Sequence, residues 1–461
     1  MAFEDLFSNL PEVAKPIRKL TLKDKLVWTG IVLVLYFVLT MLPLYGLNSN
    51  YVAQFETLAI LLAASFGSII TLGIGPLVTG SIMLQLLTGA DVIKIDTKTP
   101  EGRKKYQGYQ KMFSIFFIVF ENAAYVMSGA LPPANSTVFN ILLLIAQLTI
   151  GGLLLMLLDE VSSKWGIGSG ISLFIAAGVS REIITKGFSP MIDPRTQLPI
   201  GDIPKIFTLI SQGNASLAFW PFVSVVVTVL IFIIAVYFSG VQINIPLSFG
   251  RVRGFGIKWP IKWFYTSNIP VILTAALLAS MQFWALMMFN AGVPLLGAYE
   301  KVSLGEGRFT QQPISGVALY LQNPTISEVF EMGMTNDALI SMVFYFVFMI
   351  AGSIIFAYLW LNVGKASPSD VADQILSSGL GIPGFRRDKR ILEKILARYI
   401  MPLAILGGIT VGVLAATADM LGALSRGTGI LLTVMIIYQF YESMQKAHME
   451  EMSPMLRKVM A

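Results

Sequence analysis

Apolar and polar stretches alternate along the whole chain, and the apolar stretches have the length that crosses a membrane. A helix rises 1.5 Å per residue, so about 20 residues span the roughly 30 Å of hydrocarbon in a bilayer. Ten apolar runs of this kind occur in the chain. We predict membrane spans at about 26–45, 69–88, 111–131, 137–158, 169–187, 217–239, 260–289, 338–362, 400–418 and 427–444. The pattern therefore predicts an all-α polytopic membrane protein.

Composition and charge agree with this fold class. Hydrophobic residues make up 55% of the 461 residues, charged residues only 13%, and the mean hydropathy is +0.71. A water-soluble fold of this composition would have too little polar surface to cover itself. With ten spans, most of the 33 Lys and Arg residues fall on the side that holds both termini. Because short cytoplasmic loops carry the positive excess, we expect both the N and the C terminus to be cytoplasmic.

The residue types needed for catalysis or metal binding are scarce. Cysteine is absent, and the single histidine, His448, lies in the C-terminal tail and cannot form a zinc site alone. The sequence contains no HExxH, GxSxG or Walker A motif. Glu121 is the only carboxylate that we place clearly in the middle of a span. We predict no enzyme activity, no cofactor and no metal, and the lack of buried charge argues against an ion-coupled transporter.

Residues 51–80 form an unusual entry into the second span. The stretch YVAQFETLAILLAAS (51–65) has helical composition but is too short to cross, and SFGSIITLGIGPLVTG (65–80) follows it with several glycines and Pro76. This pattern predicts a segment that dips into the membrane and turns back, which is tolerated only against protein or a cavity. We expect Gly73 and Gly75 to allow close packing of the second span.

Two pairs of aliphatic residues near glycine-rich turns are candidates for a pore wall. Ile74 and Val78 lie one helical turn apart, and Ile171 and Ile175 repeat this spacing after the GIGSG turn (166–170). Spacing alone does not distinguish a pore-facing position from one that faces lipid or a neighbouring helix.

Two cytoplasmic loops carry basic residues among aromatic residues and glycines, in SFGRVRGFGIKWPIKW (248–263) and GIPGFRRDKR (381–390). Such loops can orient the chain and attract anionic lipid headgroups. They can also bind a phosphate backbone, where arginine grips oxygens and aromatic rings stack on bases. The charge pattern leaves both interpretations open.

Several segments together resemble one family over the whole chain. They are ITLGIGP (70–76), GIGSGISLFIAAG (166–178), WPIKWFYTSNIPVIL (259–273), GFR (384–386) and GTGILL (427–432). The chain resembles the SecY family, the large subunit of the protein-conducting channel, and PGFRRDKR differs from the bacterial PGIRPG pattern, which favours the archaeal form. The resemblance implies two pseudo-symmetric five-helix halves around an hourglass pore with a re-entrant plug helix. The sequence itself does not reveal this repeat convincingly.

The resemblance assigns residues to these parts. The halves are 1–215, with spans 1–5 and the plug at about 52–67, and 216–461, with spans 6–10 and cytoplasmic loops at about 240–262 and 363–399. The implied pore ring is Ile74, Val78, Ile171, Ile175, Ile272 and Leu432. Gly67 and Ser68 would be the plug hinge. Thr79, Glu121 and Asn268 match the polar cluster of a lateral gate, although a static hydrogen-bond network would use the same residues.

The resemblance also implies partners. The two basic loops would dock a translating ribosome, which makes Arg251, Arg253, Arg386 and Arg387 candidate contacts. SecE-like gamma and small beta subunits, signal-bearing nascent chains and membrane lipids complete the expected partners. The function implied is a conduit for unfolded secretory polypeptides that also releases membrane segments sideways into lipid. The alternatives are a secondary transporter of a small solute and a membrane scaffold without a pore.

Overall fold

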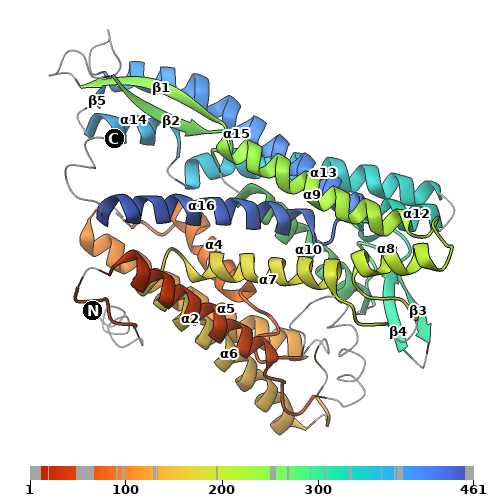
Figure 1. The fold of residues 1–461 in the computed structure, drawn as a ribbon. Coiled ribbons are helices and arrows are strands. Elements are labelled where there is room, and N and C mark those ends of the chain that lie inside the picture. The colour runs from red at the N-terminus through yellow and green to blue at the C-terminus, as the bar shows by residue number, and fades with distance from the viewer. Residues whose placement is uncertain are drawn as a thin grey trace. The chain divides into compact units, whose positions relative to one another are not determined.

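The computed structural model shows a predominantly helical chain (Figure 1). It describes residues 12–451 apart from 19, 48–66, 90–91, 96–98, 128–130, 132, 136, 194–195, 250–255, 267–268, 291, 306–307, 332–334, 365, 378–379 and 382–387. Within these residues, a helix occupies each of the ten predicted spans. In order they are α2 (Leu22–Met41), α4 (Gly75–Gly89), α5 (Pro100–Met127), α6 (Val138–Trp165), α7 (Gly170–Phe188), α9 (Phe219–Gly240), α10 (Ile269–Asn290), α13 (Asn336–Val363), α15 (Lys389–Met420) and α16 (Gly427–Glu451).

Length and hydropathy of the described helices support membrane insertion. By these two measures alone, α2, α6, α9, α13 and α15 can each cross a bilayer, and α4 is a shorter apolar helix. Besides the ten helices at the predicted spans, the described residues contain four short helices: α8 (Asp202–Ser211), α11 (Val317–Tyr320), α12 (Ile326–Glu331) and α14 (Pro368–Ser377). The prediction of an all-α fold with ten long helices is therefore confirmed, with small β-structures added in the connections.

Four predicted spans begin at a clearly different residue from the helix that occupies them. The third, predicted from 111, begins at Pro100. The second span begins as a helix only at Gly75, because residues 67–74 form turns in which Gly67 and Gly73 adopt φ of 79° and 56°. The seventh begins at Ile269, because residues 260–262 end a strand and residues 263–266 form bends and turns. The ninth begins as early as Lys389. Leu392, Leu396 and Ile400 form a buried apolar stripe along one face of this first part of the helix, although basic residues lie between them.

The chain divides into two compact units. Unit 1 comprises Met1–Pro204 together with Ile436–Ala461, and unit 2 comprises Lys205–Met435.

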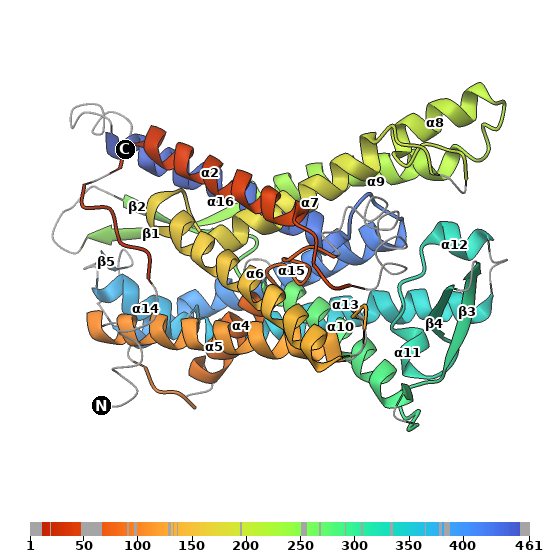
Figure 2. The same cartoon turned by 90° about the horizontal axis from the view of Figure 1, so that it is seen from below.

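In unit 1, α6 lies between α2 and α5 (Figure 2). A capping box starts α2, in which the Thr21 hydroxyl accepts from the Asp24 amide and the Asp24 carboxylate accepts from the Thr21 amide. Tyr36 of α2 stacks on Phe174 of α7, with ring centroids 4.8 Å apart. This ring pair belongs to a buried apolar cluster that joins α2, α4, α5, α6 and α7.

In unit 2, α13 and α15 pack side by side (Figure 1). Small residues allow this approach: a Cβ on Gly412 would lie 3.0 Å from the Cα of Ile350, and one on Gly408 would lie 3.0 Å from the carbonyl oxygen of Ser353. α10 approaches α13 in the same way at Gly352, where a Cβ would meet the Thr274 side chain.

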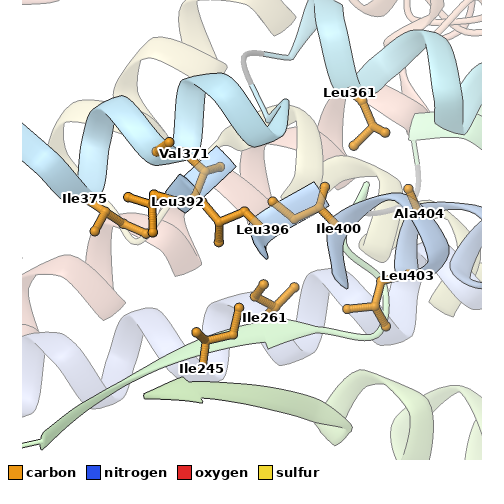
Figure 3. Packing of buried hydrophobic residues seen from close by; sticks show 11 residues of the cluster. Ile245, Ile261, Leu361, Val371, Ile375, Leu392, Leu396, Ile400, Leu403 and Ala404 are labelled. Carbon is orange, nitrogen blue, oxygen red and sulfur yellow. The ribbon is translucent and has the colours of Figure 1, made fainter. Parts of the chain in front are cut away.

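A small sheet lies at one end of unit 2, where the sequence predicted only loops. Strands β1 (Gln242–Phe249) and β2 (Gly256–Lys262) form an antiparallel hairpin, and β5 (Leu380–Gly381) pairs with the end of β1 to give the order β2-β1-β5. Figure 3 shows Ile245 and Ile261 of the hairpin facing α14 and the start of α15 across a buried cluster. The connection between α9 and α10 and that between α13 and α15 are thus one folded substructure, which we call the β-platform.

A second hairpin lies at the opposite end of unit 2 (Figure 1). It consists of β3 (Tyr299–Gly305) and β4 (Arg308–Pro313), with a register shift between Ser303 and Gly305. The stretch 313–321, which follows it, includes the single-turn helix α11, and the Ser341 hydroxyl of α13 donates to the Leu319 carbonyl.

Candidate functional site

The predicted plug, at about 52–67, lies almost entirely outside the described residues, but its C-terminal attachment is described. Ser68 is buried and forms an isolated antiparallel bridge with Pro43. The Leu44 amide donates to the Gly67 carbonyl at 2.7 Å, and the Ile69 amide donates to the Leu42 carbonyl at 3.0 Å. The backbone is therefore fixed on both sides of Ser68 by the chain that follows α2.

The glycines of the second span act differently from the prediction. Gly73 supplies a left-handed turn, and a Cβ on Gly75 would meet only the Glu121 side chain, at 3.9 Å, so neither glycine is needed for close packing. Gly80 is the close-packed position, because a Cβ there would lie 2.8 Å from the Ser114 amide nitrogen of α5. Pro76 is the second residue of α4, where a missing N–H costs no helical hydrogen bond.

The six predicted ring residues share one property: each is partly buried, neither in the core nor among the exposed apolar side chains. They are Ile74, Val78, Ile171, Ile175, Ile272 and Leu432. Each has buried residues within one helical turn, such as Phe174 near Ile171 or Leu431 beside Leu432. In unit 1, Ile74 and Ile171 pack against the same buried cluster, so these two come together as predicted.

The turn before α7 is held by an aspartate at the end of α6. The Asp159 Oδ1 atom accepts from the Ile171 amide at 2.9 Å and from the Ser169 hydroxyl at 3.1 Å. Ser169 is the N-cap residue of α7 but makes no side-chain bond to the helix backbone. A carboxylate from the preceding helix therefore takes the place of the ordinary cap.

The turn before α16 has the same construction in unit 2. The Asp419 Oδ1 atom, near the end of α15, accepts from the Gly427 amide at 2.7 Å, and its Oδ2 atom accepts from the Tyr345 hydroxyl at 2.6 Å. We did not predict Asp159 or Asp419 as site residues, because both fall just outside the apolar runs. A signal was present in the sequence: GSGI (168–171) and GTGI (427–430) each follow an aspartate by about ten residues.

Two of the three predicted lateral-gate residues lie together in unit 1. The Thr79 hydroxyl donates to the Gly75 carbonyl at 3.0 Å and lies within hydrogen-bonding reach of the Glu121 carboxylate. The third residue, Asn268, lies outside the described residues.

A cavity of about 1330 Å³ opens in unit 1 among α4, α5, α6 and the segment that begins at Glu12. Apolar side chains, including Leu77 and Ile171, line part of its wall, and the rest carries charges of both signs, among them Lys104, Lys111 and Glu160. The candidate ring position Ile171 therefore borders a polar, water-accessible space.

The four predicted ribosome contacts, Arg251, Arg253, Arg386 and Arg387, lie outside the described residues. Their immediate flanks are described, however, and belong to the β-platform. Within the described part of the chain, no group of three or more His, Cys, Asp or Glu side chains could hold a metal ion.

Comparison with protein families gives two adjoining matches. A family model described as SecY matches residues 68–441, and one described as the plug domain of Sec61p matches residues 34–67. The second range includes the whole predicted plug.

Individual relatives are similar over nearly their full length. The chain is 42% identical to the protein translocase subunit SecY of Pyrococcus furiosus, over 97% of this chain and 96% of that protein. It is 43% identical to the corresponding subunit of Methanothermobacter thermautotrophicus, over 99% and 97%. Both organisms are archaea, in agreement with the predicted form.

Two solved structures are similar in fold. One is a SecY protein whose plug domain stabilises the closed state of the channel, with a TM-score of 0.78, 37% identity and coverage of 97% of this chain and 98% of that one. The other is Sec61 in the canine ribosome-channel complex from the endoplasmic reticulum, with a TM-score of 0.74, 36% identity and the same coverage.

Proposed function

Because the chain belongs to the SecY family, it is a multi-pass membrane protein that forms a protein-conducting channel, and we propose that six aliphatic side chains form its constriction. They are Ile74, Val78, Ile171, Ile175, Ile272 and Leu432. Family membership argues against the alternatives of a small-solute transporter and a scaffold without a pore.

The observation that carries the ring proposal is the intermediate burial of all six side chains. A side chain that faces lipid has a large exposed fraction, as Val34 of α2 has at 62%. A side chain in the core has an exposed fraction close to zero, as Leu155 has. The six candidates fall between these classes, which is the expected exposure of side chains that border a narrow lumen.

The chemistry of the side chains suits a constriction for polypeptides. A narrow collar of branched aliphatic residues disfavours water and ions by dewetting. It offers no hydrogen bonds to a passing chain, so an extended segment does not bind to it. A catalytic group would have no use there, and we propose that the chain has no enzyme activity of its own.

Site-specific photocrosslinking tests the ring. A probe at Val78 or Ile272 is presented with a stalled ribosome whose nascent chain carries a signal sequence. We expect crosslinks to the nascent chain that disappear when the signal is deleted. A probe at Val34, on the exposed face of α2, serves as the matched control and should crosslink to lipid. A nascent chain that reaches neither Val78 nor Ile272, while the signal is engaged elsewhere in the protein, would overturn the ring assignment.

We propose that Gly67 and Ser68 are the hinge of a plug that closes the collar from outside. Residues 42–44 pair with the backbone on both sides of Ser68, so a moving segment would be tethered there. Gly67, at φ 79°, is the described residue with the conformational freedom that a hinge requires.

We propose that Thr79 and Glu121, with Asn268, form the polar cluster of a lateral gate. The proximity of Thr79 to Glu121 supports the pairing of the first two. Polar contacts of this kind between membrane helices contribute about 0.6 kcal/mol on average, so they can hold a gate closed and still break during opening.

We propose that the β-platform presents the basic loops to a translating ribosome. Its buried core and the pairing of β5 with β1 hold the two loops at one place, which supports joint docking through Arg251, Arg253, Arg386 and Arg387. The fold similarity to a channel solved in complex with a ribosome supports the same partner.

The remaining assignments are also proposals. The halves divide at about residue 215, the protein lies in the plasma membrane with both termini in the cytoplasm, and SecE-like gamma and small beta subunits bind it together with lipids. The positive excess on one side of the ten helices supports this orientation.

A further inference from the structure

Both helices that follow a glycine-rich turn, α7 and α16, are fixed to the helix before them by a carboxylate. Asp159 of α6 binds the Ile171 amide, and Asp419 of α15 binds the Gly427 amide, at 2.9 and 2.7 Å. The first amides of a helix have no partner inside the helix and carry the positive end of its dipole. A carboxylate placed there makes a charge-assisted hydrogen bond, about twice as strong as a neutral one.

Each junction has a second point of contact. A Cβ on Gly170 would lie 2.6 Å from the Cα of Asp159, and a Cβ on Gly427 would overlap the backbone carbonyl oxygen of Ala415. Neither position therefore accepts a side chain without displacing backbone. A hydrogen bond and a close backbone approach, taken together, fix both the height and the rotation of a helix relative to its predecessor.

The partners of the two carboxylates show that they are themselves held in place. The Ser169 hydroxyl donates to Asp159 and does not cap its own helix, and the Tyr345 hydroxyl of α13 donates to Asp419. The neighbouring carboxylate Glu160 points to a different set of groups, Lys111 and Lys164. Asp159 is thus distinct from Glu160, the other acidic side chain of α6.

The helices held in this way carry half of the proposed ring. Ile171 and Ile175 are on α7, and Leu432 is on α16. A rotation by one residue would turn a ring side chain by about 100° on its helix. We propose that Asp159 and Asp419 are positioning residues that set the rotation of α7 and α16 and thereby keep the constriction closed and selective for signals. This inference rests on the ring proposed above.

The test measures two properties of the full chain in lipid bilayers: ion conductance without substrate, and translocation of a substrate with a defective signal. The variants are Asp159→Ala and Asp419→Ala, with Asp159→Asn and Asp419→Asn as milder forms that keep an acceptor oxygen. Asp24→Ala is the matched control, since it removes a capping aspartate from α2, which carries no ring residue. Ile175→Asn, a direct change in the ring, is the positive control.

We expect each alanine variant to raise ion conductance and defective-signal translocation by about tenfold, the effect of one lost charge-assisted hydrogen bond. The asparagine variants should fall between the alanine variants and the wild type, and Asp24→Ala should match the wild type in both readouts. If an alanine variant does not fold, the asparagine variant of the same position decides the outcome.

Two results would separate the inference from the proposal on which it rests. If Ile175→Asn leaks while the folded Asp159 and Asp419 variants stay tight, the ring stands and the positioning role is wrong. If Ile175→Asn stays tight as well, the ring assignment fails. If Asp24→Ala conducts ions as strongly as the Asp159 and Asp419 variants, the leak comes from a general loss of helix stability. That result would overturn the positioning role.

Discussion

Lys164 and Glu12 are joined by a hydrogen bond of 2.6 Å that ties the segment before α2 to the last turn of α6. The same ammonium donates to the Val13 carbonyl at 2.7 Å, and the Glu160 carboxylate accepts from the Val13 amide at 2.9 Å. The Trp165 indole completes the attachment by donating to the Ala14 carbonyl. Residues 12–14 thus border the charged cavity of unit 1 as a fixed strap.

Replacing Lys164 should release this strap. In Lys164→Ala, Glu12 and the Val13 carbonyl lose their shared donor, and we expect residues 12–18 to become mobile. Because the chain has no cysteine, a spin label on Ile17→Cys, at a fully exposed position, reports this motion without interference. The pair with Glu12, which is 62% exposed, contributes about 1 kcal/mol or less to stability. Glu160 loses Lys164 as well but keeps Lys111, so the temperature of global unfolding should fall only slightly.

Lys186→Ala is the control for this experiment. Lys186 of α7 pairs with Glu182, four residues before it, just as Lys164 of α6 pairs with Glu160. Unlike Lys164, it makes no described bond to the strap. A spin label that became equally mobile in Lys186→Ala, or remained immobile in Lys164→Ala, would contradict the role of Lys164.

The strap should also loosen in acid. The hydrogen bond from Lys164 lowers the pKa of Glu12 below its ordinary value. A group with a lowered pKa in the folded state stabilises the fold at pH values above its unfolded pKa, and that contribution disappears as the pH falls through the folded value. We therefore expect the Ile17→Cys label to stay immobile at neutral pH and to gain mobility only below the usual titration range of glutamate. Glu12→Gln should remove the part of this transition that belongs to Glu12, and an unchanged transition would show that another group causes it.

The extent to which the sequence predicts this fold depends on the kind of signal. Ten apolar runs of membrane-spanning length identify the ten long helices in the right order, because burial in lipid demands long continuous stretches. The same measure fails at Ile261, which we included in the seventh span. In the structure it belongs to β2, paired with Ile243, and apolar content alone does not distinguish a short strand from the start of a helix.

The candidate site was predictable only in part for a related reason. The spacing and the family pattern predict Ile171 and Ile175 as ring residues, and this assignment stays a prediction. Asp159 and Asp419 escape a search for charges in the middle of spans, because each lies one residue beyond a predicted apolar run (137–158 and 400–418). Their role becomes visible only when the structure shows which backbone amides they bind.

The contact between α4 and α5 at Gly80 should tolerate no larger residue. In Gly80→Ala the new Cβ would lie 2.8 Å from the Ser114 amide nitrogen, so one helix must move. We expect a loss of about 1–3 kcal/mol in the free energy of unfolding, the usual cost of overpacking. Gly30→Ala in α2 is the matched control, because nothing lies within 4 Å of its Cβ position. Thermal unfolding in detergent should show a lower midpoint for Gly80→Ala and no decrease for Gly30→Ala, and equal midpoints would refute the packing argument.

A substitution at Gly67 should affect the proposed plug. Alanine at φ 79° is strained by about 1–2 kcal/mol, so Gly67→Ala favours a different backbone path next to Ser68. We expect an increase in ion conductance of the channel without substrate. Gly213→Ala introduces the same strain at the same φ, after α8 and outside the plug region, and should leave conductance unchanged. Conductance that rises in both variants would mean that strain in general, and not the hinge, opens the channel.

The β-platform offers a way to weaken ribosome docking without changing a basic residue. Ile375 of α14 is fully buried in the cluster shown in Figure 3, between the hairpin and α15. Ile375→Ala should leave a cavity that costs about 2–5 kcal/mol, which is large for so small a substructure and should loosen the pairing of β5 with β1. We expect weaker binding of ribosomes to the reconstituted channel, while the conductance without substrate stays that of the wild type. Ile391→Ala removes the same side chain from the exposed face of α15, at 37% exposure, and should bind ribosomes normally. Hydrogen exchange would verify that the β-platform is loosened in Ile375→Ala. Normal ribosome binding by a variant loosened in this way would show that the arginines dock independently of the β-platform.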